Sequence, residues 1–209
     1  MANQETAYGL RPIGMVGSGP NSTGITEYEI ASNNTNAIFN GEIVVPLNTG
    51  FIDQAGDTAG GTTQALGVLT GVQYHDSVQK KPVFSNYWPG SNNVSVDTNH
   101  PVRAFVADNP NQLFQCASDA SLTDKATAQA AVFANATLGT SARSGSTSTG
   151  RSSSALSVSS IATTATLGLR IVGIQDDADN EDYAAAGLPV IEMFNNHALL
   201  QADSEAAIS

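Results

Sequence analysis

The chain has 209 residues, a net charge of −11 and only eight Lys and Arg residues, a balance that repels a phosphate backbone. Lys80 and Lys81 form the only adjacent basic pair, which we interpret as part of a solvated turn. No apolar run approaches the roughly 20 residues that cross a bilayer, and the first residues lack a secretory signal. We therefore expect no nucleic-acid partner, no membrane partner and synthesis in a cytoplasm.

Apolar residues make up 41% of the chain but stand in short groups separated by Ser, Thr, Asn and Gly, which turns favour. Short apolar groups suit thin β layers better than thick helical bundles. The pattern predicts an all-β fold, a β-sandwich or barrel-like body with many loops, one short helix and an extended N-terminal arm.

The predicted arm comprises residues 1–24, where seven Gly and Pro residues preclude a long helix. Residues 25–209 then form a single β-rich domain, with a possible subdivision near residues 120–150. Because an extended arm often grips a neighbouring molecule, we place Tyr8, Leu10 and Arg11 at an interface.

Strands are predicted where alternating or β-branched apolar runs are bounded by turn residues. The runs are residues 25–30, 37–47, 65–74, 95–108, 113–118, 167–174 and 188–194. Residues 37–47 indicate two strands joined by an Asn-Gly turn. Cys116 is the only cysteine, which excludes an internal disulfide, and we expect it in or near a strand as a small apolar residue.

One stretch carries a helical pattern, SLTDKATAQAAVFANATLG, with Gly139 beyond its end. Ser121 or Thr123 can cap the helix, and Asp124 lies near the positive end of its dipole. The sequence predicts a short helix from about Asp124 to Ala131.

The stretch SGSTSTGRSSSALSVSSIATTA, residues 144–165, has the composition of a flexible linker. Its second half nevertheless places Leu156 and Val158 at the period of two that a half-buried strand requires, and the apolar run LGLRIVGI follows. We therefore interpret the stretch as an ordered hydroxyl-rich loop that leads into strands.

No catalytic, cofactor or metal site is predicted. The acidic loop at residues 176–182 suggests calcium, but an EF-hand spacing would require Gly at Asp182 and Glu at Leu188. We interpret it as a solvated loop and leave calcium binding open. His75, His100 and His197 lack an accompanying nucleophile signature, so we expect each to be a surface or loop residue that forms hydrogen bonds.

Five segments in chain order resemble virion structural proteins of tailed bacteriophages, including cyanophages and other aquatic phages, of the capsid decoration or cement type. The segments are AYGLRPIGMVGSGPNSTGITEY, GVQYHDSVQKKPVFSNYWPG, AFVADNPNQLFQC, STGRSSSALSVSSIATTATLGLRIVGIQDDADNEDY and VIEMFNNH. They are distributed along most of the chain, between residues 7 and 197, and contain no catalytic fingerprint.

The resemblance implies a non-enzymatic protein of the virion surface, made in the host cytoplasm. It implies a β-rich homotrimer that binds the outside of the head and bridges neighbouring major capsid protein subunits. Arg151 would then be available to a carboxylate across an interface. Trp88, beside Phe84 and Tyr87, is either core or an exposed docking residue.

An alternative of a different class is a carbohydrate- or receptor-binding β module of a phage tail or fibre. Trp88 and Tyr87, if exposed, would stack on sugar faces, and the acidic loop would hold calcium. A hydrolase on a β scaffold is a weaker alternative, because the sequence carries no nucleophile signature.

Overall fold

The fold is given by a computed structural model, which describes residues 3, 7–18, 24–55, 64–139, 144–175 and 178–200. Its elements in chain order are β1 (Arg11–Met15), the 3₁₀ turn η1 (Val16–Ser18), β2 (Ile25–Ile30), β3 (Ile43–Pro46), β4 (Ile52–Gln54), β5 (Gly67–Asp76), β6 (Lys81–Ser85), β7 (Val102–Ala107), β8 (Gln112–Ala117), α1 (Lys125–Ala130), β9 (Asn135–Ala136), β10 (Gly145–Ser146), β11 (Arg151–Ser152), η2 (Val158–Ser160), β12 (Leu169–Ile174) and β13 (Pro189–Phe194). The all-β prediction is confirmed, with α1 the one α-helix among these described residues.

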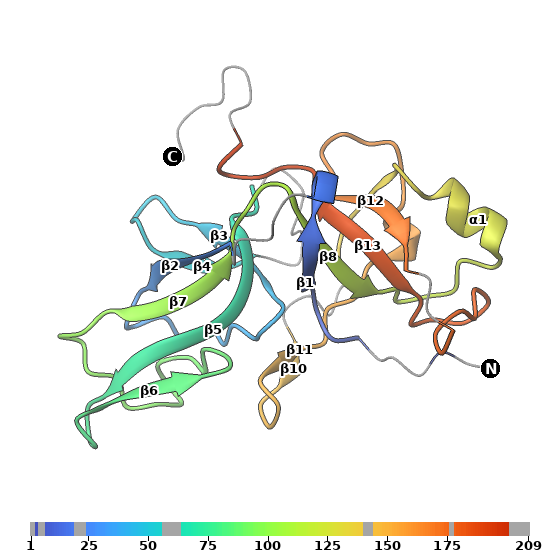
Figure 1. Ribbon diagram of the computed structural model, residues 1–209. Coiled ribbons are helices and arrows are strands. Elements are labelled where there is room, and N and C mark those ends of the chain that lie inside the picture. The colour runs from blue at the N-terminus through green and yellow to red at the C-terminus, as the bar shows by residue number, and fades with distance from the viewer. Residues whose placement is uncertain are drawn as a thin grey trace.

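A closed barrel forms one half of the molecule, on the left of Figure 1. Its strands follow the order β3-β4-β2-β7-β5, and β3 pairs with β5 to complete the ring, while β6 extends from β5 outside it. Leu69, Val72 and Tyr74 of β5 all belong to the core inside the barrel. Leu69 and Val72 are three residues apart instead of two, and the β-bulge between Leu69 and Gly71 supplies the extra residue. Both side chains can therefore point into the barrel.

A second, five-stranded sheet forms the other half, in the order β1-β8-β13-β12-β9, with α1 at its outer end (Figure 1). Phe114 of β8, Ile171 of β12 and Phe194 of β13 point from this sheet into a core that also contains Ile43 and Val45 of the barrel strand β3. The two sheets therefore share one hydrophobic core.

Helix α1 begins where the sequence predicts. The Oδ1 atom of Asp124 accepts a hydrogen bond from the backbone N–H of Thr127 at 2.7 Å, which satisfies a donor of the first helical turn. The N-cap is therefore Asp124, and the prediction of Ser121 or Thr123 as the cap is wrong. The helix spans Lys125–Ala130, within the predicted bounds.

Residues 144–165 are ordered, as predicted. They form the small hairpin β10–β11, visible at the lower centre of Figure 1 between the two halves, and then enter the core at Leu156. Ser152 and Ser154 are buried beside it, and their hydroxyl groups contact each other at 2.8 Å. The expected strand at Val158 is instead the 3₁₀ turn η2, and Leu156 forms isolated bridges to Ser118 and Leu138.

The predicted hairpin at residues 37–47 is only half correct. Its second strand is β3, but Ile38 forms an isolated bridge to Trp88, and Asn40 bridges to Arg151. Both partners are remote in sequence, so the local Asn-Gly pattern does not set the pairing.

The arm is extended, and its residues 7–18 are built into the body of the molecule. Strand β1 pairs antiparallel with β8, and Leu10 is buried in the shared core. Gly9 and Gly41 allow the segment to cross the turn before β3. The N–H of Leu10 donates to the Gly41 carbonyl at 2.9 Å, and a Cβ on Gly9 would lie 2.6 Å from the same oxygen.

We predict that Gly9→Ala destabilises the protein much more than Gly17→Ala. Both glycines have left-handed φ angles, 77° and 80°, so each alanine costs about 1–2 kcal/mol. Only Gly9 also approaches another backbone closely, because nothing lies within 4 Å of a Cβ at Gly17. Urea unfolding of the two variants measures the difference, and equal losses would contradict the close crossing.

Candidate interaction surface

The five residues predicted at an interface separate into buried and accessible groups. Leu10 and Trp88 are fully enclosed within this chain, and Tyr8 is buried as well. The Arg11 guanidinium lies over the Tyr8 ring, 3.7 Å from its centroid, in a cation–π contact. Arg151, on β11, is exposed. Of the five, Arg11 and Arg151 retain side chains that solvent reaches.

Trp88 is a core residue of the barrel. Its indole N–H donates to the Asn34 carbonyl at 3.2 Å, and its ring meets Tyr74 edge-on, with 5.7 Å between centroids. Tyr87 stacks on Phe39 with 5.1 Å between centroids. A fully buried indole has no face to offer a sugar, so the residue on which the carbohydrate-binding alternative mainly depended is missing from the surface.

The acidic loop is described only in part, since Asp176 and Asp177 lie outside the described residues. Asp182 holds the adjoining turn: its Oδ1 accepts the N–H of Ala184 at 3.1 Å. The side chain of Asn3 also joins this loop, donating to the Asp182 carbonyl at 2.9 Å. Within the described ranges, no group of three His, Cys, Asp or Glu residues is placed to hold a metal ion.

The histidines fall into two environments. His75 and His100 stack with 4.2 Å between ring centroids. His197 is buried and so is not a surface residue, but it lies in the segment after β13, outside the named strands, and forms a hydrogen bond as expected of a loop histidine. The chain after β13 folds back onto the barrel, where the N–H of Ala198 donates to the Ala65 carbonyl at 2.8 Å. Burial lowers the pKa of His197, and its Nδ1 accepts the N–H of Leu199 at 3.0 Å.

Glu192 is a buried acid that the sequence analysis missed. On β13 it alternates with Val190 and Phe194, both in the shared core, so the alternation itself places the carboxyl inside. Neither carboxyl oxygen has a hydrogen-bond partner in the described part of the chain. Burial raises the pKa of Glu192 to about 8 and also raises that of the neighbouring buried thiol, Cys116. Cys116 lies in β8, as predicted.

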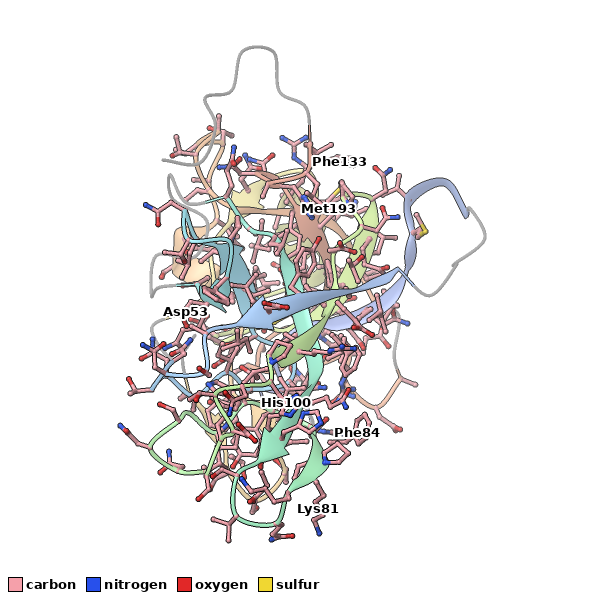
Figure 2. The ribbon with its side chains drawn as sticks, turned by 90° about the vertical axis from the view of Figure 1, so that its left-hand side faces the viewer. Asp53, Lys81, Phe84, His100, Phe133 and Met193 are labelled. Carbon is pink, nitrogen blue, oxygen red and sulfur yellow. The ribbon has the colours of Figure 1, made fainter. Side chains whose placement is uncertain are left out.

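Nine large apolar side chains are exposed in the described part of the chain, and three of them are more than 70% exposed. Val78, at the tip of the β5–β6 hairpin, is 76% exposed, and Phe84 on β6 is 71% exposed. Phe133, just after α1, is 78% exposed. In Figure 2, Phe84 lies near one end of the molecule and Phe133 near the other.

Phe133 has an unusual backbone conformation. Its φ is 71°, a left-handed value that is unfavourable for a bulky side chain. The conformation is held because the Phe133 N–H donates to the Ile171 carbonyl of β12 at 2.8 Å, while the Ile171 N–H donates to the Ala134 carbonyl at 3.0 Å. The turn therefore exposes the Phe133 ring to solvent, although its left-handed backbone conformation costs conformational energy.

A groove of about 470 Å³ lies next to Phe133, between α1 and β12. Lys125 and Gln129, one helical turn apart, line the α1 side together with Val132. Residues 172–175 line the β12 side. The groove combines apolar side chains with amides and one cation, a composition suited to holding a polypeptide.

Comparisons with known proteins do not identify a relative. No family model matches the chain, and neither the curated proteins nor the solved structures give a match. Within the described part of the chain, no helix combines the length and apolar character that a membrane crossing needs. The function must therefore be inferred from the residues and their geometry.

We predict that Glu192 makes the protein less stable as the pH rises. The folded pKa of about 8 exceeds the ordinary value of 4.5, so between these pH values the folded state holds a proton that the unfolded state releases. The free energy of unfolding then falls by up to about 1.4 kcal/mol per pH unit.

Urea unfolding across that pH range checks this prediction. Glu192→Gln cannot ionise, so this contribution to the slope disappears, whereas the exposed control Glu29→Gln keeps it. An unchanged slope in Glu192→Gln would show that the buried carboxyl does not titrate as described.

We also predict that Phe133→Gly stabilises the fold by about 1 kcal/mol, because glycine adopts a left-handed φ without steric cost. The exposed ring contributes little burial that could be lost. Phe133→Ala keeps a Cβ, and with it the strain, so it serves as the matched control. Denaturant midpoints measure both variants, and a less stable Phe133→Gly protein would mean that the ring supports the fold.

Proposed function

We propose that the chain is a non-enzymatic capsid decoration, or cement, protein of a tailed bacteriophage. In this role it binds the outer surface of the head and stabilises contacts between major capsid protein subunits, after synthesis in the host cytoplasm. The resemblance of its five sequence segments to such proteins motivates the proposal. The all-β body with its accessible apolar side chains supports it.

The observation that carries the proposal is the exposure of Val78, Phe84 and Phe133. Each side chain is more than 70% exposed, so none contributes substantially to the protein's own cores. Contacts between proteins are enriched in aromatic side chains at their centres, and two of these three exposed residues are phenylalanines. The three residues sit at a hairpin tip, on an outer strand and at a helix end, where a neighbour can reach them.

A rigid frame suits this role. A cement protein stabilises a shell by mass action, since it binds the assembled lattice better than the separate subunits. Weak contacts suffice when several copies act together, as a homotrimer would allow. A closed barrel that shares a core with a second sheet loses little conformational freedom on binding.

Charge supports a surface position. A net charge of −11 keeps a crowded shell soluble and discourages adhesion to nucleic acid. Of the five interface residues predicted from the sequence, we propose Arg11 and Arg151 for contacts with carboxylates of a partner. Leu10 and Trp88 are left out, because both are enclosed in this chain.

We predict that the purified chain binds expanded heads that lack it, in hundreds of copies, and raises the temperature at which they rupture. Val78→Ser combined with Phe84→Ser should weaken binding at least about tenfold, because burying each apolar side chain contributes about 1.5–3 kcal/mol. Quantitative gel analysis of sedimented heads measures the occupancy.

The control is Asn92→Ser, an exposed polar change in the segment between β6 and β7. It should leave both occupancy and rupture temperature unchanged. A handful of copies per particle would favour a tail or neck position, and no binding at all would reject the proposal.

A further inference from the structure

Strand β12 has an open edge beside the groove. Strand β9 pairs with only its first two residues, Leu169 and Arg170. Ile171 is next, and its N–H and carbonyl are used by Ala134 and Phe133. Beyond Ile171, no described strand pairs with β12 on the side opposite β13.

The backbone of Ile174 points toward this open edge. Gln175, the next residue, donates its N–H to the Pro189 carbonyl on the β13 side, at 2.9 Å. Because successive residues of an antiparallel strand alternate between its two edges, the N–H and carbonyl of Ile174 face away from β13. An added strand could use both groups.

Helix α1 forms the opposite wall and carries the charge. Of the described residues that line the groove, only Lys125 is charged. Gln129 and Gln175 offer amides that can bond to a peptide backbone, and Val132 and Phe133 offer apolar surface. A strand edge that faces a helix across such a groove offers room for an extended segment.

We propose that this groove binds an extended segment of a partner protein by strand addition to β12. The segment carries an acidic side chain for Lys125 and an apolar side chain that packs on Phe133. Main-chain hydrogen bonds along β12 supply affinity, and the two side chains supply specificity. The left-handed turn at Phe133 then has a use, since it presents the ring at the rim of the groove. This binding of a partner segment does not depend on the proposed role at the phage head.

Gly173 provides a way to block the groove without damaging the fold. It lines the groove, its φ is not left-handed, and nothing lies within 4 Å of a Cβ built on it. Gly173→Val therefore places a side chain in the groove, where it narrows the space for the side chains of the added segment, and valine suits a strand. Thermal unfolding of this variant verifies that the fold is retained.

The test selects a random peptide library on the immobilised full chain and measures selected peptides by fluorescence anisotropy. Selected peptides should combine acidic and apolar residues. Gly173→Val should weaken binding about tenfold or more, Lys125→Glu by several-fold and Phe133→Gly by several-fold despite its relaxed backbone. Phe84→Ala, which removes an equally exposed ring at the other end, should leave the affinity unchanged.

Amide hydrogen exchange gives the second readout. Bound peptide should slow exchange of the Ile174 amide, whose N–H faces the open edge, which a ligand held only by side chains would not do. Failure to select any peptide, affinity that is indifferent to Gly173→Val, or an unprotected Ile174 amide would each overturn the proposal. Self-association of the wild-type chain that Gly173→Val abolishes would also overturn it, because the occupant would then be a second copy. None of these outcomes depends on binding to heads.

Discussion

The double burial of β3 is the constraint on which the rest of the structure depends. Val44 points into the barrel, while Ile43 and Val45 on either side of it point into the core shared with the second sheet. The same strand closes the barrel by pairing with β5. Neither core can form fully without β3 in register, because a slip of one residue would exchange the two faces. The surfaces that project from the two sheets are therefore held in a fixed relation.

Local sequence patterns predict the elements well where neighbours in the chain decide the structure. The alternation of residues 25–30 gives β2 at its observed bounds, and Asp124 marks the start of α1. The patterns fail where the partner is remote. Ile38 has the sequence context of a hairpin, yet its partner is Trp88, a pairing set by packing inside the barrel that no local pattern encodes.

The candidate site is less predictable than the fold, for two different reasons. Glu192 could have been found, since its alternation with Val190 and Phe194 already points it inward. Phe133 could not, because the sequence shows that a helix ends near it but not that the next turn is left-handed. That turn depends on the hydrogen bond between Phe133 and Ile171, and Ile171 lies on β12, which is remote from Phe133 in the sequence.

The two exposed rings, Phe84 and Phe133, bear on the proposed bridging role. A protein that joins two neighbours needs contact surfaces that are separate, so that one partner does not exclude the other. Phe84, on the barrel side, and Phe133, at the α1 groove, lie toward opposite ends of the molecule (Figure 2). Because the shared core fixes these ends relative to each other, binding at one end positions the other. Such preorganisation makes the second contact effectively intramolecular, and this is how modest interfaces can hold a lattice together.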